Sequence, residues 1–210
     1  MDLIVAVCRA LANPSRLALL HVVHTHPEIT VQELAHALKV PVDAASKHLK
    51  LLGGLHLVRA IPHGRYVKCS PASGSSTTNR FLRHLQVLLK EVMESKDPNR
   101  TLAQVCDSVT APSWEAVWKA MEKVFTAYTH LRRLLLLRFV ATHGTGGSTE
   151  MAENIGLSAD ALRRHLDKLE RRRLLMATGI NEDQWCLAPQ TGPAFRRQML
   201  ELILRELKAT

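Results

Sequence analysis

Residues 31–52, VQELAHALKVPVDAASKHLKLL, contain two short helix patterns separated by a turn. The first pattern begins with a capping box, because Thr30 stands immediately before it and Glu33 stands three residues further on. The second begins at Pro41, and its apolar residues recur at the spacing of one helix face: Ala45, Leu49 and Leu52. A Gly-Gly pair at 53–54 ends it. This stretch therefore predicts two short helices joined by a tight turn.

The flanking sequence predicts helices before this stretch and a β-hairpin after it. Residues 2–12 form an apolar-rich helix pattern that Asn13-Pro14 ends, since proline disfavours helix at the residue before it. The next helix opens at Pro14 or Ser15. Two extended segments, 58–61 and 66–70, flank a turn at 62–65 (Pro-His-Gly-Arg). A polar loop over 73–78 leads to a long amphipathic helix, which Asn79 caps and which extends to about residue 95.

The chain repeats itself at an offset of 117 residues. RLALLHVV at 16–23 aligns with RLLLLRFV at 133–140, and 17 of the 54 positions from 16 to 69 are identical without a gap. Chance gives only a handful, so we interpret the repeat as a duplication. The expected domains are 1–97 and 113–210, with 98–112 as a linker in which 101–109 forms one more helix.

The second copy repeats the same order of elements. Ser113 and Ser158 are expected to cap helices, and 144–147 is expected to be a loop. The remaining expected elements are helices over 131–142, 149–155, 159–171 and from Pro193 to about 208, and strands near 175–180 and 184–187. The fold class is therefore mainly α with small β-hairpins, in two tandem copies.

Helices followed by a two-stranded hairpin, with a basic last helix before it, are typical of the winged helix-turn-helix fold. Four segments of the first copy resemble the ArsR family of bacterial repressors: ALANPSRLALL at 10–20, VQELA at 31–35, SKHLKLL at 46–52 and LVRAIPHGRYV at 57–67. The resemblance covers about residues 4–95, and 114–208 looks like a diverged second copy. It implies a cytoplasmic transcriptional regulator whose fourth helix enters the major groove and which dimerises through its first and last helices.

The chain departs from the metal-sensing members of that family. Paired cysteines at the start of the third helix are replaced by TVQE at 30–33, and His84 stands alone on the last helix. We therefore expect no metal and no cofactor. His21, His24 and His26 leave a zinc or pH-sensing site as the alternative to surface histidines. Cys69 and Cys186, which the gap-free repeat places at equivalent positions, leave a redox switch as the alternative to small strand residues.

The charge and the recognition helices favour double-stranded DNA as the partner. The net charge is +9, which attracts polyanions, and nine aromatic residues are few for a protein that stacks single-stranded bases. The candidate DNA-contacting residues of the first copy are Ser46, Lys47, His48 and Lys50 on the fourth helix, and Arg65 on the hairpin. Those of the second copy are Arg163, Arg164 and Lys168. Asp43 and Asp167 are local exceptions, and the acidic pair Glu182-Asp183 would repel phosphate.

These features predict a sequence-specific DNA-binding regulator, a repressor in function, in which the two copies act as a pseudo-dimer within one chain. The copies would pack through 2–12, 79–95, 113–129 and 193–208 and read two different half-sites, and a further homodimer remains open. The alternative is a tandem winged-helix scaffold for protein–protein interaction. No nucleophile–base set or phosphate-binding glycine loop is present, so we expect no enzyme. The longest aliphatic run, 134–137, is too short for a membrane span, and four widely spaced cysteines favour a reducing cytoplasm.

Overall fold

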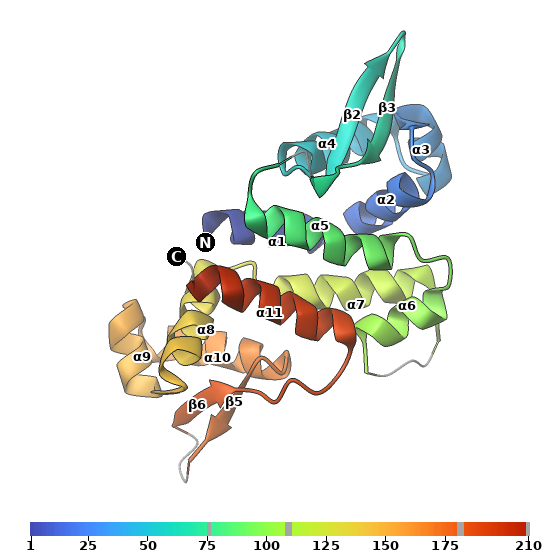
Figure 1. The fold of residues 1–210 in the computed structure, drawn as a ribbon. Coiled ribbons are helices and arrows are strands. Elements are labelled where there is room, and N and C mark those ends of the chain that lie inside the picture. Colours follow the sequence, from blue (N-terminus) through green and yellow to red (C-terminus); the bar gives the residue numbers. More distant parts are fainter. Residues whose placement is uncertain (75–76, 108–110, 180–182, 209–210) are drawn as a thin grey trace. The chain divides into compact units, whose positions relative to one another are not determined.

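The computed structural model describes residues 1–74, 77–107, 111–179 and 183–208, and it is mainly helical with two small antiparallel sheets in this part of the chain (Figure 1). The residues form two compact units. The first unit consists of residues 13–122, and the second consists of residues 1–12 and 123–210. We describe each unit by itself.

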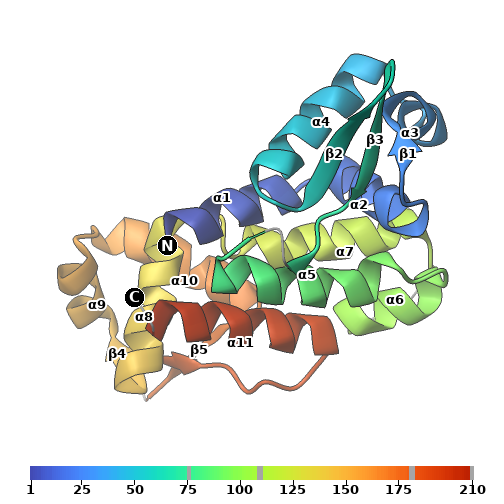
Figure 2. The same ribbon diagram turned by 45° about the horizontal axis from the view of Figure 1, so that its top comes forward.

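The first unit holds the stretch that decides the fold. Its elements are α2 (Pro14–Thr25), β1 (Ile29–Thr30), α3 (Val31–Leu38), α4 (Val42–Gly54), β2 (Val58–His63), β3 (Tyr66–Pro71), α5 (Arg80–Met93), α6 (Pro98–Val105) and most of α7 (Trp114–Thr126). The strands are ordered β1-β3-β2 and are antiparallel. Helix α4 lies alongside β2 (Figure 2), and the β2–β3 hairpin extends beyond the helices of this unit (Figure 1).

Local signals in the sequence account for where these helices begin. The capping box is present, since the Thr30 amide donates to Glu33 Oε2 at 2.8 Å and the Glu33 amide donates to Thr30 Oγ1 at 3.3 Å. Asn13 caps α2 by accepting from the Arg16 amide at 3.0 Å. The expected helices and the hairpin of the first copy are therefore confirmed, with shifts of one or two residues at their ends.

The second unit has a closely similar order of elements after its first helix. It contains α1 (Asp2–Leu11), the end of α7, α8 (Leu131–His143), β4 (Thr145–Gly147), α9 (Ser148–Ile155), α10 (Ala159–Arg171), β5 (Leu175–Thr178), β6 (Gln184–Leu187) and α11 (Ala194–Lys208). The strands are ordered β4-β6-β5. Helix α1 belongs to this unit by its contacts, because Arg9 Nε donates to the Thr129 carbonyl at 2.9 Å.

The structure corrects several expectations about individual elements. The predicted loop at 144–147 contains strand β4, and β1 was not predicted, because strands of two or three residues carry no alternation in the sequence. The helix expected over 101–109 is α6, which begins earlier because Asp97 caps it with Pro98 at its first position and which ends at Val105. Positions 108–109 of that helix, position 180 of the expected strand and positions 75–76 of the expected 73–78 loop lie outside the described residues.

The strand pairing also corrects the gap-free alignment of the two predicted copies. Cys69 pairs with Ala60 and Ile29 in the first sheet. In the second sheet, the residues 117 positions after Ala60 and Ile29 are Ala177 and Gly146. Both pair with Trp185 and not with Cys186. The second hairpin is therefore one residue shorter, and Cys186 corresponds to Ser70. Cys69 and Cys186 are not equivalent, and only Cys69 of the two is fully buried.

Two left-handed backbone positions occur at matching places in the two units. Lys39 (φ 53°) ends α3, and Gly156 (φ 67°), 117 residues later, ends α9. His56 (φ 54°) and Arg173 (φ 53°), also 117 residues apart, follow α4 and α10. Non-glycine residues seldom adopt this conformation, so these chain reversals are set by the surrounding fold.

The two histidines of α2, His21 and His24, are half-buried, whereas His26, just after the helix, is exposed as expected. The His21 ring lies 4.1 Å from the Trp114 ring between centroids, and its Nδ1 is 2.9 Å from the Met93 carbonyl oxygen. Burial lowers the pKa of His24 to about 4, and His21 and Lys90 add to this effect. In the described part of the chain, no three His, Cys, Asp or Glu side chains are placed to hold a metal ion.

No single helix among the described residues is long and apolar enough to cross a membrane. Helices α1 and α2 reach the necessary length and hydropathy only if they are taken together as one broken segment.

We predict that exchanging the residues at the two equivalent helix ends changes stability in opposite directions. Lys39→Gly should raise the free energy of unfolding by about 0.5–1 kcal/mol, because glycine adopts a positive φ without a steric penalty. Gly156→Lys should lower it by a similar amount. Urea unfolding monitored by circular dichroism measures both variants, and a destabilised Lys39→Gly protein would contradict the left-handed assignment.

We also predict that His24 makes the protein sensitive to acid. Below pH 6.5 the unfolded chain takes up a proton at this position, whereas the folded protein does so only near pH 4. Stability that is present above pH 6.5 should therefore fall by about 3 kcal/mol as the pH is lowered to 4. Urea unfolding of the wild type and of His24→Leu across this range isolates the effect, since the variant should lose less. Parallel pH profiles would show that His24 is not responsible.

Candidate nucleic-acid interface

Helix α4 buries one face and leaves the opposite face open. Ala45, Leu49 and Leu52 have exposed fractions of 0%, 5% and 0%, as their spacing predicts. The candidate contact residues Ser46, Lys47 and Lys50 are exposed. Because a helix turns 100° per residue, burial of the first three residues fixes the outward direction of the second three.

An acidic residue lies on this outward face. Lys47 Nζ is 3.3 Å from Asp43 Oδ2, one helical turn earlier. Both side chains are more than 70% exposed, so the ion pair is weak and can open when another anion approaches.

The structure places His48 differently from the other candidates on α4. It is half-buried, and burial together with the positive charge of Arg16 at the start of α2 lowers its pKa. His48 is therefore mainly neutral at pH 7 and lies toward α2, at the edge of the outward face.

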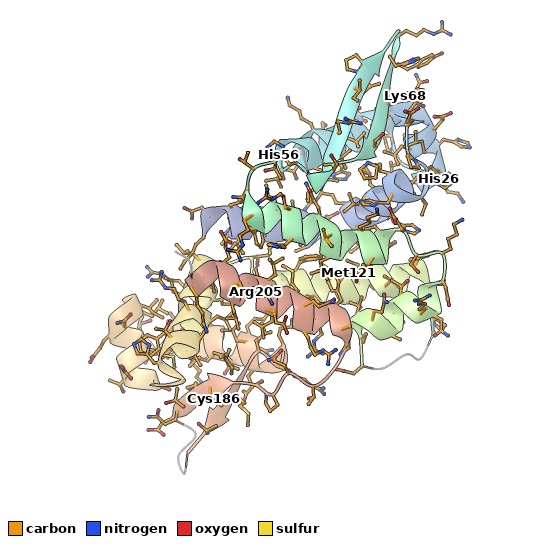
Figure 3. The ribbon with its side chains drawn as sticks, viewed as in Figure 1. His26, His56, Lys68, Met121, Cys186 and Arg205 are labelled. Atoms are coloured by element: carbon orange, nitrogen blue, oxygen red, sulfur yellow. The ribbon has the colours of Figure 1, made fainter. Side chains whose placement is uncertain are left out.

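The hairpin next to α4 has a two-residue turn at Gly64-Arg65, because His63 pairs directly with Tyr66. Gly64 has φ 60°, which glycine adopts easily. The Arg65 guanidinium carbon lies 5.0 Å from the centre of the Tyr66 ring, a cation–π contact that orients the guanidinium at the tip. Lower on the hairpin lies Lys68, which is labelled in Figure 3. Its Nζ is 3.2 Å from Glu28 Oε2, so this lysine is already paired.

A groove of about 550 Å³ separates α4 from the hairpin. Ser46 and Lys50 line it from the helix, and Arg59 lines it from β2. Arg59 is exposed, and sequence reasoning did not single it out. Its position on β2, opposite Ser70 of β3, could have been anticipated once the hairpin was predicted.

The corresponding helix of the second unit, α10, is more basic. Leu162, Leu166 and Leu169 are buried, and Arg163 and Arg164 are exposed. Lys168 is half-buried and lies beside α8, where burial and then the charges of Arg172, Arg133 and Arg171 lower its pKa. The sequence predicted that Lys168 faces outward together with the two arginines, and the structure places it to one side of them.

The second hairpin keeps part of its predicted acidic character. Asp183 is exposed, and its main-chain carbonyl accepts from the Ser148 amide at 2.9 Å. Glu182 lies outside the described residues.

The structure does not favour Cys69 as a redox-active thiol. Its side chain is fully buried, and burial raises the pKa of the thiol, so the reactive thiolate is disfavoured.

Comparison with known proteins agrees with this geometry. Residues 11–59 match the family model of a helix-turn-helix domain. The match begins at the end of α1 and extends to the first residues of β2, so it includes α2, α3 and all of α4. No curated protein matches the chain. The match supports a winged helix-turn-helix protein that binds double-stranded DNA and regulates transcription.

Proposed function

We propose that this chain is a sequence-specific, ArsR-like transcriptional repressor that binds double-stranded DNA in the cytoplasm of a bacterium. The observation that carries this proposal is the exposed face of α4 within the helix-turn-helix match. Lysine and serine side chains suit contacts to phosphates and base edges, and a helix of this kind fits the major groove. Ser46, Lys47 and Lys50 would make these contacts, with His48 at their edge.

The hairpin would extend the contact beyond α4. Arg65 at its tip is held by Tyr66 and is suited to a phosphate or to the minor groove. Arg59 lines the groove between hairpin and helix and would add a phosphate contact there.

We further propose that residues 113–210 are a diverged copy of residues 1–97, although residues 1–12 belong to the second compact unit and residues 113–122 to the first. The repeat in sequence and the matching left-handed positions support this proposal. So do equivalent hydrogen bonds: the Val40 amide donates to Ala35 O and the Leu157 amide to Ala152 O, at 3.0 and 2.9 Å. Shared backbone irregularities of this kind are not expected from helix packing alone.

Two copies in one chain would act as a pseudo-dimer. Their recognition helices differ at three of the outward positions, where Ser46, Lys47 and Lys50 correspond to Arg163, Arg164 and Asp167. We therefore expect an asymmetric operator with two different half-sites about one duplex turn, ~34 Å, apart. DNA footprinting also tests whether two whole chains bind together. A symmetric footprint with two chains bound would contradict the pseudo-dimer.

A protein-interaction scaffold is the second candidate, and one observation favours it. Ile61, Tyr66 and Val67 on the first hairpin are each about 40% exposed, so the hairpin presents apolar surface that DNA does not require. Salt dependence separates the two functions, because phosphate contacts weaken steeply with salt and apolar contacts do not.

We predict that reversing the charge of Lys50 weakens binding to the operator. Lys50→Glu should lower the affinity about tenfold and reduce the slope of log affinity against log salt by about 0.9, the value for one phosphate contact. Fluorescence anisotropy with duplex DNA measures both quantities. The matched control is Lys96→Glu, an exposed lysine between α5 and α6.

The double variant Arg163→Glu/Arg164→Glu applies the same test to the second unit. It should abolish specific binding if both copies contact DNA. Wild-type affinity in this variant would contradict the pseudo-dimer, and wild-type affinity in Lys50→Glu would contradict the assignment of α4.

We predict that removing the carboxylate of Asp43 strengthens DNA binding. Asp43→Asn removes a charge that repels phosphate and releases Lys47 from its ion pair, so the affinity should rise by about threefold to tenfold at low salt. Glu91→Gln on the exposed side of α5 makes the same change in net charge and serves as the control. An equal gain in both variants would mean that only net charge matters.

A further inference from the structure

Basic residues lie not only on the outward face of α10 but also on the side of this helix that faces α8. The His130 and His165 rings lie 4.6 Å apart between centroids. Arg133 Nη2 donates to the Thr126 carbonyl at 2.9 Å and to Thr129 Oγ1 at 2.8 Å, and Arg172 Nη2 lies 3.5 Å from Thr126 Oγ1. The two guanidinium groups therefore share Thr126.

In the described part of the chain, no carboxylate forms an ion pair with the central groups of this cluster. Within the described residues, the structure pairs none of His130, Arg133, His165 and Lys168 with Asp or Glu. After burial, the charges that lower the pKa of His165 and Lys168 all come from basic residues. The acidic residues of α10 lie around the helix from Lys168, on the side away from α8: Asp160, Asp167 and Glu170.

The fold itself does not require these charges, as the first unit shows. At the equivalent positions of that unit, Leu51 replaces Lys168 and Leu55 replaces Arg172. Only Arg16 and His48, the equivalents of Arg133 and His165, remain. Lys168 is repelled by its basic neighbours Arg172 and Arg133, so this lysine weakens the folded state unless an anion binds beside it.

We propose that the cluster formed by His130, Arg133, His165, Lys168 and Arg172 is a binding site for a phosphate group. Guanidinium, ammonium and imidazole groups donate the charge-assisted hydrogen bonds that phosphate oxygens accept. The cluster also lies at the N-terminus of α8, whose dipole attracts anions. The phosphate comes either from the DNA backbone next to α10 or from a free phosphorylated compound.

Inorganic pyrophosphate is a suitable probe, because it tests the site without requiring that the protein binds DNA. Isothermal titration calorimetry on the full chain, with sodium chloride keeping the ionic strength constant, should show saturable binding. Lys168→Leu introduces the residue of the first unit and should weaken binding about tenfold. Lys96→Leu, at an exposed position between α5 and α6, makes the same substitution outside the cluster and outside the proposed DNA interface, and should leave binding unchanged. His165→Gln is a second variant and should also weaken binding, and circular dichroism checks that all variants are folded.

Repeating the pyrophosphate titration in the presence of duplex DNA identifies the source of the phosphate. Loss of pyrophosphate binding would identify the DNA backbone as the occupant, and its retention would identify a free phosphorylated compound. The site is overturned if the wild type does not bind pyrophosphate, or if Lys96→Leu weakens binding as much as Lys168→Leu does. A protein that binds pyrophosphate but no DNA would retain the site and refute only the proposed function.

Discussion

Burial of Ala45, Leu49 and Leu52 is the constraint on which the rest of the proposed interface depends. These three side chains fix the rotation of α4 about its own axis, so they determine that Ser46, Lys47 and Lys50 face outward. The capping box at Thr30 and the left-handed residue at Lys39 set where α3 begins and ends, and thereby where α4 can start. A polar residue at any of the three buried positions would affect the fold and the interface together.

The same pattern of burial occurs in the second unit, but the exposed sides of α10 differ from those of α4. In the second unit, Leu162, Leu166 and Leu169 are buried in the same pattern, but the remaining sides of α10 carry more basic residues, and one side of the helix faces further cations on α8. A duplicated domain can keep its core while its surfaces diverge, because core packing tolerates little change and exposed positions tolerate much more. In our account, the exposed face of α4 recognises DNA in the usual helix-turn-helix way, and the basic cluster beside α10 binds a phosphate group.

Much of the fold could be predicted from the sequence, because caps, prolines and helix periodicity are local signals. The capping box and the Ser158 cap marked the starts of α3 and α10 correctly. Strands β1 and β4 could not be predicted in this way, since they exist only by pairing with β3 and β6. The one-residue difference between the hairpins was also hidden, because the chance identity of Cys69 and Cys186 favoured an alignment without a gap.

The candidate site was less accessible to sequence reasoning. Helix periodicity identified the exposed residues of α4, but it could not show that His48 lies beside Arg16 or that Lys168 lies beside Arg133. Those neighbours come from other helices, and their approach depends on tertiary packing. The helix-turn-helix match supports the DNA-binding role, while the individual contact residues stay predictions.

The most direct test of the central claim is fluorescence anisotropy with duplex DNA from upstream of the gene that encodes this protein. A scrambled duplex of the same length and composition is measured beside it, at a low and a high salt concentration. The account predicts tighter binding to the native fragment, and this preference should persist at high salt because base contacts depend less on salt than phosphate contacts do. Equal binding to both duplexes that disappears at high salt, or no binding at all, would contradict a sequence-specific regulator that recognises this site.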